Sequence, residues 1–376
     1  MNKIFKIIGI LVAVVVIGLL IAQISKKPGE LRIGVIAPLT GDAAIYGNPL
    51  KKGLDLAKDE INSKGGINGK NISLIYEDSY ANSNAAVSAF NKLISVNRVS
   101  IIIGDMFSQS TLAIAPLAQK NKIVLLSPTA SSEKVPETGD YVFSIYPNDS
   151  YDGEFIAKFV FNTLHILKAA VICVQADAML TAKNAFVKTY NELGGNVLAE
   201  ESYPSKTDDF RTILIKAKFS NPDLIFIPGY LEEIVKILKQ AKELGIKSQF
   251  ITISTAYDEK LFSLATNTAQ SLMLSAPFYE ENSSSASQEI FAFQELYKKK
   301  YNEIPNVWAA YGYDALKIIC KAYKDAIKNK SSLNIELSMI KSYPGVTGET
   351  TFLKNRKVDK RLRILIVNNN KFIEYK

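Results

Sequence analysis

The sequence predicts an α/β protein built from two lobes, each with a parallel β-sheet covered by helices. The chain has 376 residues, more than one hydrophobic core usually organises, and 47% of them are hydrophobic. Apolar runs with the length of buried strands alternate with segments in which apolar residues recur at helical spacing. This alternation restarts after Tyr146-Pro147-Asn148, so a second lobe is expected to begin there.

The first run of alternation starts at residues 31–37, a continuous apolar stretch typical of a strand in a parallel sheet. The next apolar residues recur at helical spacing, and Gly65-Gly66 ends that helix. Helices alternate with further strands in this run, and those strands are predicted at residues 72–77, 100–104 and 123–127.

The second run alternates in the same way and is followed by a long helical section. Its strands are predicted at residues 169–174, 224–228 and 249–253, with helices before, between and after them. Two helices are expected at 288–301 and 308–328. The last segments, 363–367 and 372–375, are separated by Asn368-Asn369-Asn370 and predict an antiparallel hairpin.

The N-terminal residues predict an export element. Lys3 and Lys6 precede an apolar run at residues 7–22, and a positive start before a short apolar core is typical of a secretory signal. Residues 1–30 are therefore expected to be either a cleaved signal peptide or an uncleaved signal-anchor that holds the protein on the membrane. No cysteine follows the apolar core, which argues against a lipoprotein anchor. Both alternatives place the body of the protein in the periplasm or otherwise outside the cytoplasm.

Several classes of function lack their sequence signals. The single histidine, His165, lies near an expected helix end, and no phosphate loop, dinucleotide fingerprint or nucleophile elbow is present. The net charge of +8 is scattered over expected helix faces, without a nucleic-acid-binding module. Cys173 and Cys320 are expected to be buried free thiols. We therefore expect a binding protein rather than an enzyme, with no metal, no cofactor and no nucleic-acid partner.

Two polar loops follow neighbouring predicted strands of the first lobe. Residues 105–111 contain Ser108 and open a helix, and residues 128–132 contain Thr129 and Ser131. Because ligands of open parallel sheets bind at the carboxyl ends of strands, these loops are candidates for a site. Hydroxyls and unpaired N–H groups at a helix start suit a carboxylate or carbonyl oxygen. The alternative is that Ser108 and Ser131 only cap helices.

The sequence resembles the branched-chain amino-acid-binding proteins of ABC importers, the leucine-binding family of periplasmic proteins. The resemblance covers nearly the whole chain from Leu31, and its motifs stand at residues 33–41, 59–70, 102–104, 311–315 and 345–348. It implies the type I periplasmic binding protein fold, with two Rossmann-like lobes, a three-crossover hinge and the ligand enclosed between the lobes. It also implies delivery of a small organic solute, such as an amino acid, amide or small carboxylate, to an ABC transporter permease. An extracellular module that presents its solute to a receptor partner is the alternative.

The same resemblance implies where the chain crosses between lobes. Crossings are expected near Pro147, near Ala276-Pro277 and near Tyr343-Pro344. The first lobe would then contain residues 31–147 and 277–343. The second would contain 148–276 and 344–376.

The resemblance also implies a ligand site, although the amino-acid signature is incomplete. Ser254 stands where the leucine binders have the glutamate that receives the ligand's ammonium, and Ala178 replaces an aromatic residue. Asp258, four residues on, is a candidate replacement for that carboxylate; without it, the ligand is expected to lack a cationic amine. The implied ligand-binding residues are Tyr46, Phe107, Ser108, Thr129, Ser131, Tyr230, Ser254 and Asp258.

Overall fold

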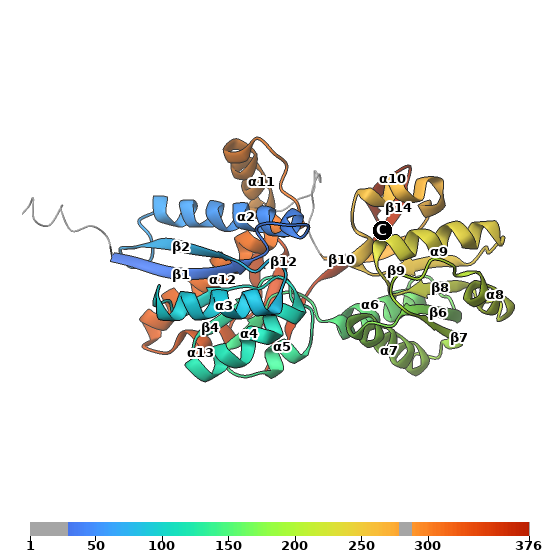
Figure 1. The fold of residues 1–376 in the computed structure, drawn as a ribbon, viewed down its shortest axis with the longest axis horizontal. Helices are drawn as coiled ribbons and strands as arrows, with labels where there is room; N and C mark the ends of the chain where they lie inside the picture. Colours follow the sequence, from blue (N-terminus) through green and yellow to red (C-terminus); the bar gives the residue numbers. More distant parts are fainter. Residues whose placement is uncertain (1–28, 278–287, 376) are drawn as a thin grey trace, which may run out of the picture.

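The computed structural model describes residues 29–277 and 288–375, which form two α/β lobes arranged side by side (Figure 1). The predicted export element lies almost wholly outside the described residues. The chain runs through the first lobe, the second lobe, the first lobe again and finally the second. The predicted fold class is confirmed.

The first lobe contains a five-stranded parallel sheet. Its strand order is β2-β1-β3-β4-β5, formed by Lys70–Asp78, Gly29–Ala37, Ile101–Ile103, Val124–Ser127 and Val142–Ser144. Successive side chains of a strand point to opposite faces. Ile33 and Val35 accordingly enter the core on one face of the sheet, whereas Ile36 enters the core on the other.

Helices cover both faces of this sheet. The core with Ile33 includes residues of α2 (Ala44–Ser63), α11 (Gln288–Tyr301) and α12 (Val307–Asn329), and the opposite core includes α3 (Ser83–Ser95), α4 (Ser108–Asn121) and α5 (Lys134–Glu137). Helices α2 and α12 approach closely through two glycines. A Cβ at Gly53 would lie 1.9 Å from the Ala309 carbonyl oxygen, and one at Gly312 would lie 2.3 Å from that of Leu50. This packing fixes the late helix α12 in the first lobe.

The second lobe contains a seven-stranded sheet in which β14 and β15 run antiparallel to their neighbours. Its order is β15-β14-β10-β9-β8-β6-β7. The strands are β6 (Lys168–Val174), β7 (Asn196–Tyr203), β8 (Leu224–Ile227), β9 (Gln249–Thr252), β10 (Met273–Pro277), β14 (Leu362–Asn368) and β15 (Lys371–Glu374). The predicted C-terminal hairpin is therefore confirmed, and it forms one edge of this sheet.

Five α-helices and two short 3-10 helices of the second lobe pack around one core. Helices α6 (Asp149–Asn162) and α7 (Asp177–Glu192) pack together, as do α8 (Arg211–Phe219), α9 (Leu231–Glu243) and α10 (Lys260–Ala265) in sequence (Figure 1). The turns η1 (Ser254–Ala256) and η2 (Thr266–Ala269) flank α10. Cys173 lies in this core and Cys320 in the first lobe; both are buried and free, as expected.

A small three-stranded sheet corrects the expected position of the third crossing. It contains β11 (Tyr343–Gly345), β12 (Gly348–Phe352) and β13 (Val358–Lys360), and it follows α13 (Leu333–Ser338). Val346 and Phe352 belong to the core of the first lobe, not the second. The carboxylate of Asp314 on α12 accepts the N–H groups of Val346 and Thr347 at 2.9 and 2.8 Å. Residues 344–360 therefore pack on the first lobe, and the chain joins the second sheet only at β14.

Among residues 29–277 and 288–375, no helix is both long enough and apolar enough to cross a bilayer. The apolar run that suggested an anchor, residues 7–22, lies outside these ranges.

Candidate functional site

The two polar loops of the first lobe are tied to each other at the carboxyl ends of β3 and β4. The hydroxyl of Ser127 donates to the Asp105 carbonyl at 2.6 Å, and that of Thr129 donates to the Met106 carbonyl at 2.7 Å. The N–H of Ser132 donates to Ser108 Oγ at 3.1 Å. Because Ser108 only accepts in this bond, its hydroxyl hydrogen remains available to a ligand. Thr129, in contrast, uses its hydrogen to join the loops.

An aromatic cluster stands beside these loops. Tyr46, in the first turn of α2, contacts the rings of Phe107 and Trp308 edge to face, with centroids 6.0 and 5.5 Å away. Edge-to-face geometry is a favourable arrangement for aromatic pairs. The structure thus brings Tyr46 and Phe107, two of the candidate ligand-binding residues, into contact. Trp308, the single tryptophan of the chain, completes the cluster from the start of α12.

The second lobe contributes the carboxyl ends of β8 and β9. Tyr230 precedes α9 and is 44% exposed. Gly229 before it leaves room for Tyr203, because a Cβ there would lie 2.5 Å from the Tyr203 hydroxyl. Ser254 begins the turn after β9, and the Asp258 carboxylate accepts the N–H of Lys260, the first residue of α10, at 2.8 Å.

One hydrogen bond and one electrostatic effect indicate that these sets of residues face each other across the lobes. The hydroxyls of Tyr146, in the first core, and Ser254, in the second lobe, lie 3.2 Å apart in a hydrogen bond. The pKa of Tyr46 is raised mainly by burial and also by the charge of Asp258. The carboxyl ends of the two sheets therefore face each other between the lobes, and this is where we place the candidate site, called here the interlobe site.

Asp149 is a charged residue of this site that the sequence analysis did not select. It begins α6 directly after the first crossing, and its N–H donates to the Ser131 carbonyl at 3.0 Å. Burial raises the pKa of its carboxyl, and the charge of Glu133 raises it further, whereas a hydrogen bond from the Ser131 side chain lowers it. The pKa of Tyr230 is raised mainly by burial and by Glu233, and also by Asp149. Asp149 therefore lies between a first-lobe and a second-lobe candidate.

A second acidic residue, Asp152, is buried one helical turn further along α6. Its carboxyl accepts a hydrogen bond from the Ser275 hydroxyl on β10. Burial raises the pKa of Asp152 to about 7. The Asp152–Ser275 hydrogen bond therefore links α6, which begins just after the first crossing, to β10, which ends at the second crossing.

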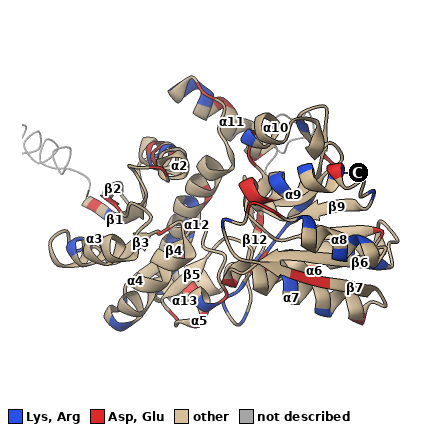
Figure 2. Ribbon diagram, turned by 45° about the vertical axis from the view of Figure 1, so that its right-hand side comes forward, with Lys and Arg blue, Asp and Glu red and all other residues tan. Residues whose placement is uncertain are grey.

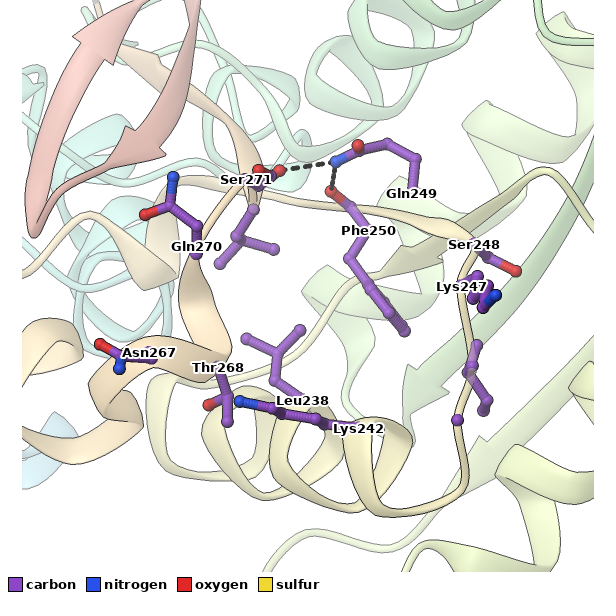
Figure 3. Close-up of a pocket in the computed structure, with 13 residues that line it drawn as sticks. Leu238, Lys242, Lys247, Ser248, Gln249, Phe250, Asn267, Thr268, Gln270 and Ser271 are labelled. Carbon is purple, nitrogen blue, oxygen red and sulfur yellow. Dashed lines mark hydrogen bonds between the residues drawn. The ribbon is translucent and has the colours of Figure 1, made fainter.

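A depression of about 370 Å³ lies elsewhere on the second lobe (Figure 3). It is bordered by Leu238 and Lys242 of α9, by Phe250 of β9 and by Asn267 and Thr268 of η2. None of the eight expected ligand-binding residues lines it. Among the described residues, no group of three His, Cys, Asp or Glu side chains is placed to hold a metal ion.

Two α/β lobes with polar and aromatic groups meeting at the carboxyl ends of both sheets define the class of two-lobed solute-binding proteins. Within this class, a family model described as periplasmic binding protein matches residues 30–371, and the chain belongs to that family. Leu/Ile/Val-binding protein homolog 1 of Brucella abortus (strain 2308) is 25% identical over 301 residues, which is 80% of each protein. The expected family is thus confirmed.

Solved structures agree over 92% of the chain. The leucine binding protein LivK of Thermotoga maritima MSB8 is 27% identical, with a TM-score of 0.79 and 98% of its chain covered. The branched-chain amino acid transporter substrate binding protein LivJ of Streptococcus pneumoniae, in complex with isoleucine, is 29% identical, with a TM-score of 0.77 and its whole chain covered. The protein is accordingly a substrate-binding protein of the ABC-transporter type, and its family implies a location outside the cytoplasm.

Proposed function

We propose that the interlobe site takes a small aliphatic α-amino acid in its zwitterionic form and that the protein, which has no catalytic role, passes it to an ABC permease. Relatives are described as binding leucine, isoleucine and valine, and one solved relative contains isoleucine. The description of that solved relative as a transporter substrate binding protein favours import over sensing. The presence of Asp149 carries the proposal, because it supplies the negative charge that Ser254 cannot.

The ligand's carboxylate is assigned to the start of α4. This helix begins at Ser108 without a side-chain cap, so its first N–H groups are available to an anion. The Ser108 hydroxyl adds a donor there. We expect the apolar side chain of the ligand to lie against Tyr46, Phe107 and Trp308, because aromatic rings offer large apolar surfaces.

The ligand's ammonium is assigned to Asp149. An enclosed ammonium needs a partner, because an unpaired buried charge costs several kcal/mol. The Asp149 N–H donates to the Ser131 carbonyl, the Ser131 side chain lowers the pKa of the Asp149 carboxyl, and the charge of Asp149 raises the pKa of Tyr230. Asp258 is the other acidic candidate, but its carboxylate already accepts the N–H of Lys260 at the start of α10.

The experiment compares leucine with 4-methylpentanoate, which keeps the carboxylate and side chain but lacks the amine. Calorimetry should show binding of leucine to the native protein, and Asp149→Asn should weaken it by about 100-fold or more, the usual scale for removing one partner of a buried ion pair. The matched variant Asp258→Asn should bind leucine nearly as the native protein does.

Two results would overturn the assignment. If Asp149→Asn binds leucine with the affinity of the native protein, Asp149 does not contact the ligand's ammonium. Tighter binding of 4-methylpentanoate than of leucine to the native protein would show that the ligand lacks a cationic amine.

A further inference from the structure

Exposed basic side chains gather at the end of the first lobe that lies away from the interlobe site. In a parallel sheet the strands begin at one edge, and the covering helices end there. This end therefore carries the starts of β1 and β2, the loops before β3 and β4, and the last turns of α4 and α12. Its basic residues, which we call the basal face, are Arg32, Lys70, Arg98, Lys120, Lys122, Lys328 and Lys330.

The order of the chain places these residues together. Lys70 stands opposite Gly29 in the register of β1 and β2, while Arg98 and Lys122 come three and two residues before β3 and β4. Helix α12 runs alongside α2 as far as the Glu60–Lys317 ion pair and then continues to Asn329. Figure 2 shows basic residues at the ends of α3 and α4, on the side where β1 begins.

The charge of the basal face is not neutralised locally. All seven side chains are exposed, and none forms an ion pair with another described residue, although many other lysines do. The helix dipole accounts for lysines at the ends of α4 and α12. It does not account for Arg32 and Lys70, which lie on strands. The acidic neighbours are Glu30 and, shortly before β5, Glu137 and Asp140. Asp140 pairs with Arg356, so the seven basic groups face only two unpaired carboxylates among the described residues and the face stays positive.

The sequence before Gly29 indicates what this face meets. The apolar run at residues 7–22 ends six residues before Gly29, and the intervening segment carries Lys26 and Lys27. Six residues span roughly 20 Å at full extension. An apolar segment inserted in a bilayer would therefore hold the basal face close to the lipid headgroups. A positive surface held there attracts anionic lipids within about one Debye length, roughly 8 Å at physiological salt.

We propose that the basal face docks on a membrane surface rich in anionic lipids, while the N-terminal segment stays uncleaved as a tether. The first lobe then rests on the bilayer, and the second lobe, which lies beyond the interlobe site, points away from it (Figure 1). This orientation is independent of which solute the site binds.

The experiment reconstitutes the full chain in vesicles and measures energy transfer from a labelled cysteine to fluorescent headgroups. Val96→Cys places the label beside the basal face, where Val96 is 69% exposed, and Phe219→Cys places it on the second lobe, where Phe219 is 86% exposed. Cys173 and Cys320 are buried and do not compete for the label. With phosphatidylglycerol present, the Val96→Cys label should transfer strongly and the Phe219→Cys label weakly. Pure phosphatidylcholine, or salt of about 1 M with a Debye length near 3 Å, should abolish most of the difference.

Charge reversal gives the matched control. The triple variant Lys70→Glu, Lys120→Glu, Lys328→Glu should lose the transfer from Val96→Cys on phosphatidylglycerol vesicles. Lys239→Glu, Lys242→Glu, Lys247→Glu changes three exposed, unpaired second-lobe lysines by the same charge and should keep it. Equal transfer on both lipids, or equal loss in both triple variants, would show that the basal face does not dock. If cells cleave the native chain before Gly29 and release it from their membranes, the N-terminal segment is not a tether and that part of the proposal is wrong.

Discussion

At the scale of single residues, Ser108 and Thr129 show how similar side chains take different roles. Both follow strands of the first sheet, and both are hydroxyl residues. Ser108 Oγ accepts an N–H, whereas the Thr129 hydroxyl donates its hydrogen to a carbonyl. The direction of one hydrogen bond therefore separates a residue that can still donate to a ligand from one that holds the loops in place.

We predict that Ser108→Ala and Ser131→Ala each weaken leucine binding by roughly 10- to 150-fold, because a hydrogen bond to a charged group is worth about 1.5–3 kcal/mol. Ser108 would lose a donor to the carboxylate, and Ser131 would lose its bond to Asp149. Calorimetry measures both. Thr129→Ala is the control. It should lower the melting temperature, because the bond between the loops is lost, and it should leave the affinity for leucine nearly unchanged. Unchanged affinity in both serine variants would place the site elsewhere.

Asp152 supports a prediction about pH. Its pKa of about 7 lies above the usual 3.8, so the folded protein holds a proton that the unfolded chain releases between about pH 4 and 7. The native state is thus favoured at the acidic end of this window and loses that advantage as the pH rises. Asp152→Asn cannot ionise. We predict that the free energy of unfolding of the native protein, relative to this variant, falls as the pH rises across the window. The slope should be about 1.4 kcal/mol per pH unit, which corresponds to one extra proton bound by the folded state.

Urea denaturation of both proteins at a series of pH values checks this. Subtracting the two profiles removes the titration of the other groups. Parallel profiles would mean that Asp152 is ionised, and stabilised by other groups, throughout the range.

At the scale of elements, the three-stranded sheet β11–β13 depends on one carboxylate. Asp314 on α12 accepts the N–H groups of Val346 and Thr347 and the Thr347 hydroxyl, and all three residues are buried. Its side chain also fills the space beside Gly345, where a Cβ would lie 2.5 Å from Oδ2. The turn between β11 and β12 is therefore built around a side chain from the long helix.

We predict that Asp314→Ala lowers the free energy of unfolding by roughly 3 kcal/mol, because it leaves two buried N–H groups without acceptors. Asp325→Ala removes another aspartate of α12, one that pairs with Lys321 near the surface, and should cost under about 1 kcal/mol. Chemical denaturation compares them. Equal losses would show that the turn finds other acceptors.

The elements that sequence patterns predicted are those with strong local signals. Helices α11 and α12 and the β14–β15 hairpin have clear periodicity or turn residues, and they lie where they were expected. Strands β5, β11 and β13 have three residues each and were not foreseen, because they are too short to show a period and lack the continuous apolar run that marked the equally short β3. The third crossing was misplaced for the same reason, since only the contact with Asp314 reveals which lobe holds β11 and β12.

Some residues of the candidate site could be selected from the sequence, and others could not. Ser108 and Ser131 lie in loops after predicted strands, so their position along the chain selected them, whereas Tyr46 and Tyr230 were selected only by the resemblance to the leucine-binding family. Asp149 follows β5 at the same spacing at which Ser108 follows β3, but β5 was not foreseen, so the sequence did not mark this position. Its importance depends on how α6 meets the first lobe after the crossing, and that arrangement is set by contacts between distant segments.

At the scale of the whole molecule, the two lobes are held together by crossings and by few contacts between side chains, such as that of Tyr146 with Ser254. A ligand that contacts both lobes binds more tightly when the lobes are closed on it than when they are apart. Because a ligand shifts a conformational equilibrium only through such a difference in affinity, it favours the closed form. The assigned residues come from both lobes, as this requires.

We predict that saturating leucine reduces the radius of gyration of the native protein in small-angle X-ray scattering. The double variant Ser108→Ala, Ser131→Ala at the same leucine concentration should keep the larger, ligand-free value, because its site is largely empty. Identical profiles with and without leucine for the native protein, at a concentration shown to saturate it, would rule out closure.

The position of β14 has a consequence for biogenesis. Its pairing with β10 joins Met273 to Ile366, and the segment between them builds α11, α12 and the small sheet of the first lobe. The chain that precedes Met273 completes the sheet of the first lobe but not its core, and it completes neither the sheet nor the core of the second lobe. A polypeptide threaded through a membrane pore N-terminus first must therefore remain incompletely folded until its final strands have emerged on the far side. Because the strands of the second lobe are interleaved with elements of the first, the chain cannot reach its native structure before it has crossed the membrane. It therefore stays unfolded enough for export until translocation is complete.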